Sequence, residues 1–284
     1  MNQNERLEYL LQKFKEDSIQ YKNLEIKGNY DEKRMVLRSL MNIRMHKKMS
    51  NEILKVQDEF LMEEAENKGI VQLSNIPTVE KQYGSKHPYA DKLSIWQGDI
   101  TRLKVGAIVN AANSQMLGCF IPCHRCIDNA IHSAAGIELR AECHSMMNRK
   151  RTQFGLEYEE PTGAAMLTKG YNLPAQYVIH TVGPIVEEKV TDDLCYALQN
   201  CYESVLKCCM ENGIRSVAFC CISTGEFKFP NDIAARIAVE TVTHILHEHS
   251  ESFERVIFNV FKDLDKKYYE QELVDGKKYL DGYK

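Results

Sequence analysis

The sequence predicts an α/β fold in which helices cover both faces of a largely parallel sheet, preceded by a helical N-terminal extension. From about Leu93 onwards, short strand-like runs alternate with longer helical patterns. This alternation favours parallel strands joined by crossover helices. Before that point the chain is rich in charge, and its apolar residues recur at helical spacing. The two patterns indicate two parts of the chain with different architectures.

Residues 1–85 form the predicted extension. Apolar residues recur at helical spacing from Leu7 to Phe14 and again from Val36 to Ile43. A third helical segment begins after Ser50, a favourable N-cap residue, and ends near Gly69. Because this part carries no catalytic cluster, we expect it to pack on the main domain; a surface that docks a partner is the alternative.

Residues 86–284 form the predicted main domain. Its expected strands are Leu93–Gln97, Ala107–Asn110, Ala164–Leu167, Tyr177–Thr181, Val217–Cys221 and Val256–Val260. Its expected helices are Ile127–Ser145, Asp193–Glu211 and Asp232–Glu248. Folds of this class bind ligands in the loops at the carboxyl ends of their strands. The loops that follow the strands are therefore where we look for chemistry.

Composition excludes several classes of function. The 284 residues include 36 basic and 40 acidic side chains, and this balance argues against a protein held on nucleic acid by a cationic surface. No apolar run approaches the roughly 18 residues of a membrane helix, and the N-terminal segment is too charged for a signal peptide. We expect a soluble cytoplasmic protein whose ten cysteines, all between Cys119 and Cys221, are reduced.

Polar residues follow the first two predicted strands. Asp99, with Ile100 beside it, either forms a turn or accepts a hydrogen bond from an exocyclic amine such as adenine N6. Asn110 and Asn113 flank two alanines, a composition that suits close approach of a ligand to the backbone; turn formation is the alternative.

A third loop leads from a buried strand towards a helix. Ser223, Thr224 and Gly225 at this junction indicate backbone N–H groups that can hold phosphate oxygens. The spacing is not that of a P-loop, because no Gly-Lys-Ser/Thr follows at the required position.

The most specific element is a cluster of thiols and imidazole. Cys119, Cys123, His124 and Cys126 fall within eight consecutive positions, and these soft donors suit zinc. Three ligands would leave an open coordination position, as in catalytic zinc sites. A closed structural site completed by Cys123 and a chance cluster of buried thiols are the alternatives.

An acidic residue follows this cluster. Asp128 lies two residues after Cys126, where it could orient water or a substrate hydroxyl, or else act as a helix N-cap. His132 and His180 are interpreted as packed histidines.

Taken in order, these residues resemble the macrodomain family, whose members bind ADP-ribose. The resemblance covers about residues 90 to 265 and implies a three-layer α/β/α fold with a mixed, largely parallel sheet. The matching segments are Gly98–Thr101, Asn110–Asn113, Asp128–His132, Gly170–Pro174, Tyr177–Pro184 and Ile222–Gly225.

The pattern Cys-x-x-Pro-x-His-x-Cys looks like that of the zinc-containing branch of MacroD-type protein-ADP-ribose hydrolases. This resemblance implies that Cys119, His124 and Cys126 bind Zn²⁺, whereas Cys123 falls at a variable position. The branch also typically carries a helical N-terminal extension.

The resemblance assigns the remaining site residues. Asp99 and the Ile100 backbone would hold adenine, Asn113 would contact the distal ribose, and Asp128 would be catalytic together with Asn113. The other residues expected to contact ADP-ribose are Cys126, Ile127, Ser223, Thr224, Gly225, Glu226 and Phe227. The sequence departs from the family where many members have Gly-aromatic-Gly, because this chain has Glu226-Phe227-Lys228.

The implied function is zinc-dependent removal of mono-ADP-ribose from protein side chains by cleavage at C1″ of the distal ribose. A non-catalytic reader of ADP-ribose, and an esterase or phosphatase acting on small ADP-ribose derivatives, are the alternatives. The same resemblance suggests a lipoyl-carrier protein, modified by a sirtuin-type transferase, as the substrate.

Overall fold

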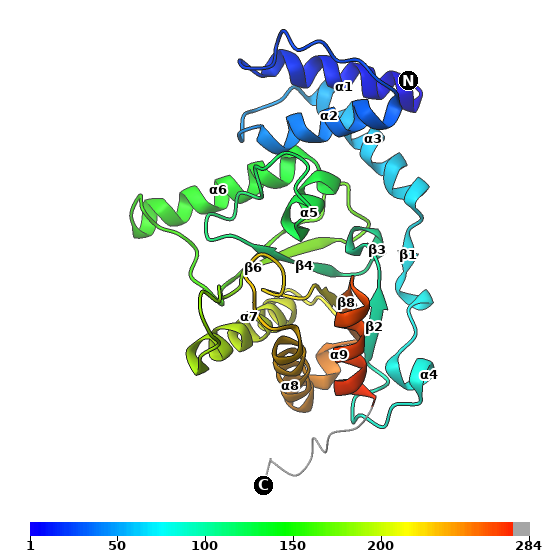
Figure 1. Ribbon diagram of the computed structural model, residues 1–284, viewed down its shortest axis with the longest axis vertical. Coiled ribbons are helices and arrows are strands. Elements are labelled where there is room, and N and C mark those ends of the chain that lie inside the picture. Colours follow the sequence, from blue (N-terminus) through cyan, green and yellow to red (C-terminus); the bar gives the residue numbers. More distant parts are fainter. Residues whose placement is uncertain (275–284) are drawn as a thin grey trace.

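The structure, a computed structural model, describes residues 1–274, so the last ten residues of the predicted 86–284 domain lie outside it. Figure 1 shows a layer of N-terminal helices stacked on a sheet-containing unit that has helices on both faces. Helices α5 (Ile127–Ala135) and α6 (Ile137–Phe154) lie between the N-terminal helices and the sheet. The opposite face is covered by α7 (Asp192–Glu211), α8 (Asn231–His249) and α9 (Asp263–Leu273) (Figure 1). In the described part of the chain, no helix is both long enough and apolar enough to cross a membrane.

Three helices form the extension: α1 (Gln3–Asp17), α2 (Tyr30–Ile43) and α3 (Asn51–Lys68). Asn2 and Asn29 form capping boxes that begin α1 and α2, and Ser50 caps α3 through the backbone N–H of Ile53. The three helices bury a core of their own, joined by one residue of α6. Its members are Leu7, Leu10, Leu11, Phe14, Leu37, Leu40, Met41, Val56, Phe60, Leu61 and Ile137.

The main sheet has six strands in the order β2-β8-β7-β4-β6-β5. All neighbouring pairs are parallel except β5 and β6, which are antiparallel, so the predicted mixed, largely parallel sheet is confirmed. The strands are β2 (Leu93–Gln97), β4 (Ala107–Ala112), β5 (Ala165–Lys169), β6 (Tyr177–Val182), β7 (Ser216–Phe219) and β8 (Arg255–Val260). A separate parallel pair is formed by β1 (Val71–Gln72) and β3 (Leu103–Lys104).

The helices of this unit are α4 (Val79–Tyr83), α5 (Ile127–Ala135), α6 (Ile137–Phe154), α7 (Asp192–Glu211), α8 (Asn231–His249) and α9 (Asp263–Leu273). The single helix predicted over Ile127–Ser145 is wrong. Gly136 interrupts it with φ +97°, a conformation that favours glycine. A Cβ at this position would also lie 2.8 Å from Nε2 of Gln57. The helix therefore ends at Gly136, and α5 and α6 are two separate helices.

Two hydrophobic cores meet near the predicted boundary at residue 85. Ile76 and Val79 already belong to the core of the sheet-containing unit, and β1 pairs with β3 of that unit. The change from one core to the other therefore falls after α3, upstream of residue 85.

Replacement of Phe60, which is fully buried in the core of the extension, should test that core. We expect Phe60→Ala to lower the free energy of unfolding by about 3–5 kcal/mol, because it removes a ring and leaves a cavity. Met62→Ala on the same helix, at a side chain that is 54% exposed, should change it by less than about 0.5 kcal/mol. Urea denaturation measures both, and similar effects in the two variants would contradict a packed extension.

Candidate active site

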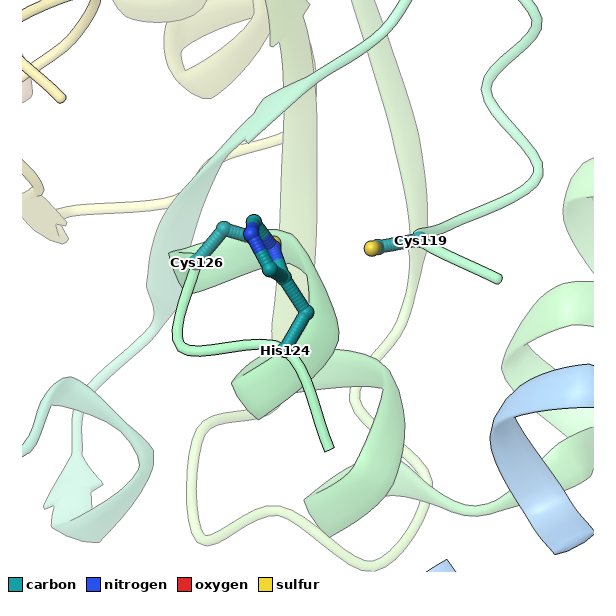
Figure 2. A group of neighbouring side chains, drawn as sticks. All are labelled: Cys119, His124 and Cys126. Atoms are coloured by element: carbon teal, nitrogen blue, oxygen red, sulfur yellow. The ribbon is translucent and has the colours of Figure 1, made fainter. Parts of the chain in front are cut away.

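Two cysteines and a histidine converge in the loop between β4 and α5. The ligand atoms of Cys119, His124 and Cys126 all lie within 4.8 Å of one another. Figure 2 shows the sulfur of Cys119 pointing toward His124 and Cys126, whose side chains lie next to each other. The Nδ1 atom of His124 is buried without a hydrogen-bond partner. Two thiols and an unpaired imidazole nitrogen at this spacing fit a zinc ion.

Local structure explains the position of Cys126. Its side chain is the N-cap of α5 and accepts a hydrogen bond from the backbone N–H of Asn129, with 3.4 Å between Sγ and N. Burial raises the pKa of the Cys126 thiol to about 12. The helix N-terminus acts in the opposite direction, because it favours the thiolate, which is the form that binds metal. Because Cys126 is the N-cap, the alternative interpretation of Asp128 as the cap is wrong.

Cys123 lies outside this group of ligands. Its Sγ contacts α2, at 3.2 Å from Oγ of Ser39 and 3.4 Å from the carbonyl oxygen of Met35. Its backbone takes the left-handed conformation, with φ +52°, which turns the chain between Pro122 and His124. The geometry therefore favours a three-residue ligand set over one closed by Cys123.

Asp128 is buried in the first turn of α5. Nδ2 of Asn110 donates a hydrogen bond to its Oδ1 at 2.8 Å, and Nε2 of His132 lies 3.4 Å from the same oxygen. Burial raises the pKa of Asp128 to about 6, against the hydrogen bond from Asn110, which lowers it. The carboxyl group is thus held in one orientation, two residues from a metal-ligand candidate.

Asn110 belongs to β4 rather than to the loop after it, and it is fully buried. Its Nδ2 also lies 3.0 Å from Nδ1 of His180, which must accept this hydrogen bond. His180 Nε2 then carries the proton and donates to Oγ1 of Thr168 at 2.9 Å. The sequence indicated Asn110 only as a residue that suits close approach of a ligand, and it assigned no catalytic or positioning role to it. A polar residue inside an otherwise apolar strand was the signal that could have identified it.

The predicted phosphate-binding loop follows β7 and is folded back on itself. The N–H groups of Lys228 and Phe229 donate to the carbonyl oxygens of Gly225 and Ser223, at 3.0 Å each. Ser223 adopts φ +64° and packs so tightly against Gly183 that a Cβ there would lie 2.1 Å from its Oγ. Lys228 also adopts the left-handed conformation, with φ +57°. The loop therefore makes this turn with a lysine at a position that favours glycine.

The loop that contains Ser223 to Phe227 lies next to the loop that contains the candidate metal ligands. Oε1 of Glu226 lies 3.8 Å from Nε2 of His124, and the Glu226 side chain is largely exposed. Thr224 and Phe227 are half-buried beside it, and Gly225 is exposed. The structure thus brings the two predicted loops, about 100 residues apart in sequence, to one place.

The remaining predicted residues lie at strand ends. Asp99 follows β2, and its Oδ1 accepts hydrogen bonds from N and Oγ1 of Thr101, at 3.0 and 2.7 Å. This geometry accounts for the turn interpretation of Asp99, and its contact with adenine stays a prediction. Asn113 is exposed just after β4 and accepts from the N–H of Gln115. Ile127, half-buried, begins α5, and Ile100 is buried at the start of a short 3₁₀ helix.

Comparisons with known proteins agree with this architecture. The Macro domain family matches residues 109–238. A protein-ADP-ribose hydrolase of Treponema medium is 44% identical over 95% of this chain and 98% of its own length. A protein-ADP-ribose hydrolase of Staphylococcus aureus is 39% identical over 94% and 95% of the two chains.

Solved structures give the same result. The Trypanosoma brucei macrodomain in complex with ADP has a TM-score of 0.62 and 29% identity, covering 84% of this chain and 95% of that one. The Oceanobacillus iheyensis macrodomain with ADP has a TM-score of 0.56 and 36% identity, covering 64% of this chain and 90% of that one.

The buried state of His180 predicts a pH dependence of stability. Desolvation lowers the pKa of His180 to about 3, so the folded protein keeps this ring neutral while the unfolded chain protonates it below about pH 6.5. The free energy of unfolding should therefore fall as the pH falls from about 6.5 towards 3, by up to ~1.4 kcal/mol per pH unit from this group.

Urea denaturation across this pH range measures the effect. His180→Gln should show a shallower dependence than the wild type, whereas His249→Gln, at a histidine whose side chain is 45% exposed, should not. Equal slopes in the wild type and His180→Gln would contradict the assignment.

Proposed function

The chain belongs to the macrodomain family of protein-ADP-ribose hydrolases, and from this premise we propose that it is a zinc-dependent enzyme. In this proposal it removes mono-ADP-ribose from modified protein side chains by cleavage at C1″ of the distal ribose. One observation supports this proposal: three features lie close together. They are the Cys119–His124–Cys126 group, the buried Asp128, and the loop that contains Glu226.

Recognition of the ADP-ribose unit would use the strand-end loops. Asp99 and the backbone of Ile100 would hold adenine, Ser223 to Phe227 would surround the diphosphate and distal ribose, and Asn113 would contact that ribose. The solved macrodomains of Trypanosoma brucei with ADP and with ADP-ribose support this proposal. Contacts to the whole nucleotide would place C1″ beside Asp128, and binding energy from remote groups is thereby used for orientation.

Cys119, His124 and Cys126 would hold the zinc ion. When bound, zinc supplies a Lewis acid that polarises a hydroxyl or water at the reacting carbon. Asp128 would accept the proton of the attacking group or orient it, while Asn110 fixes the carboxylate through its 2.8 Å hydrogen bond. The resemblance to the zinc-containing branch suggests a modified lipoyl-carrier protein as the natural substrate.

Replacement of Asp128 tests its role. We expect Asp128→Ala to lower the hydrolysis rate by at least ~100-fold, the usual effect of losing a general base, while ADP-ribose still binds. Release of label from a mono-ADP-ribosylated protein measures turnover, and calorimetric titration with ADP-ribose measures binding. Asp232→Ala, at an exposed acidic residue in the first turn of α8, is the matched control.

The same assay separates the proposed hydrolase from other functions. Turnover by Asp128→Ala at the parental rate would exclude the assigned role. A wild type that binds ADP-ribose without releasing label would be a reader. Faster cleavage of acetylated or 1″-phosphorylated ADP-ribose than of modified protein would identify an esterase or phosphatase.

Metal analysis tests the proposed ligands. We expect about one zinc ion per wild-type chain and, in Cys119→Ala and His124→Ala, loss of zinc together with loss of activity. Cys123→Ala should retain zinc, because this side chain contacts α2 instead. Full activity of zinc-free protein would contradict the proposal.

A further inference from the structure

Helix α2 of the extension makes direct contact with the loop that carries the metal-ligand candidates. Nη2 of Arg38 donates to the carbonyl oxygen of His124 at 3.3 Å. Nε and Nη2 of Arg38 also donate to Oδ1 of Asn129, at 3.1 and 2.6 Å. Arg38 therefore connects the backbone of one ligand to α5, the helix that the Cys126 side chain caps.

Asn129, which Arg38 contacts, also forms hydrogen bonds with two residues of the loop. Its Nδ2 donates to the carbonyl oxygen of Ile121 at 2.9 Å, and its backbone N–H donates to Sγ of Cys126. A single guanidinium group thus orients a residue that contacts the loop at Ile121 through its side chain and at Cys126 through its backbone.

A second residue of α2 holds the middle of the loop. Asn42 is 2% exposed, and its Oδ1 accepts a hydrogen bond from the backbone N–H of Cys123 at 2.9 Å. Its Nδ2 donates to Oγ of Ser133, on α5, at 2.9 Å. Asn42 therefore stabilises the left-handed turn at Cys123 that directs His124 towards the other ligands.

Arg140 of α6 joins α2 to the first part of the loop. Its Nε and Nη2 donate to the carbonyl oxygens of Leu117 and Cys119, at 2.7 and 3.4 Å. Its Nη1 donates to the carbonyl oxygens of Met41, Asn42 and Arg44, at the C-terminal end of α2. The partial negative charge of a helix C-terminus favours a cation at this position.

These contacts matter because residues 113–126 contain neither helix nor strand. Fixing the backbone of each residue costs conformational entropy, so a metal ion that had to order this loop would bind weakly. Contacts between the extension and the loop would remove part of that cost from metal binding. Groups that orient metal ligands typically contribute 10–100-fold to metal affinity.

We propose that the N-terminal extension is a positioning element for the metal site, with Arg38 and Asn42 as its positioning residues. The inference rests on the proposed zinc function and adds to it a role for residues 1–68. The extension contributes no ligand in this scheme. It holds the loop through Arg38 at the carbonyl oxygen of His124 and through Asn42 at the N–H of Cys123.

The test compares two arginines of the same helix in the full chain. Arg38→Met removes the contacts to His124 and Asn129, whereas Arg34→Met removes a hydrogen-bonded ion pair with Glu64 of α3, within the extension. Competition with a chromophoric chelator measures the zinc dissociation constant. Absorption bands of the Co²⁺-substituted proteins report the ligand geometry.

We expect Arg38→Met to weaken zinc binding by ~10–100-fold and to shift the Co²⁺ bands. Arg34→Met should change zinc affinity by less than about threefold, because that side chain does not contact the loop. Arg38→Lys should recover part of the affinity, since an ammonium group can reach one acceptor but lacks the planar fork. Circular dichroism confirms folding, and Arg38→Lys carries the comparison if Arg38→Met does not fold.

The outcomes are separable. A wild type that binds no zinc would overturn the proposed zinc function itself. A wild type that binds zinc, with an Arg38→Met variant of equal affinity and unchanged Co²⁺ spectrum, would overturn the positioning role alone. Equal losses in Arg38→Met and Arg34→Met would assign the effect to general stability of the extension and would also overturn it.

Discussion

The buried guanidinium of Arg140 is the interaction on which the arrangement of the site depends. It donates to five backbone carbonyl oxygens, three at the end of α2 and two in the loop that begins the metal-ligand segment. Burial lowers the pKa of Arg140 to about 10, so the group keeps its charge at neutral pH. An unpaired buried cation would be costly, and these carbonyl groups satisfy it only when the extension and the loop are both in place.

The parallel sheet supplies the second constraint. Strands β4 and β7 are neighbours, so the loops that follow them leave the same edge of the sheet. This adjacency brings Oε1 of Glu226 within 3.8 Å of Nε2 of His124. Asp128 is held near the carboxyl end of β4 by its hydrogen bond from Asn110. A nucleotide diphosphate bound by one loop would then reach the metal-ligand candidates of the other. Residues about 100 positions apart are thus brought together because their strands are parallel neighbours.

Much of this could be predicted from the sequence. Helical periodicity located the three helices of the extension, with Ser50 as the cap of the third, and apolar runs located the six strands of the main sheet. Periodicity failed to predict the structure where contacts with other elements determine the backbone conformation. Gly136 divides a continuous helical pattern because its backbone adopts φ +97°, and the side-chain amide of Gln57 of α3 packs against it. The helix Asp263–Leu273 was missed, and the strand predicted over Ala107–Asn110 continues to Ala112.

The sequence by itself determined the donor types and their spacing, because thiolate, imidazole and carboxylate chemistry is a property of the residues. It also determined the order of strands and helices along the chain, since periodicity is local. Only the tertiary structure decided which thiols converge, that Cys123 contacts α2, and that Cys126 rather than Asp128 caps α5. It also decided that the extension contacts the site, because hydrogen bonds such as Arg38 to Asn129 join residues 91 positions apart. Sequence periodicity cannot specify such pairs, which depend on how the helices pack.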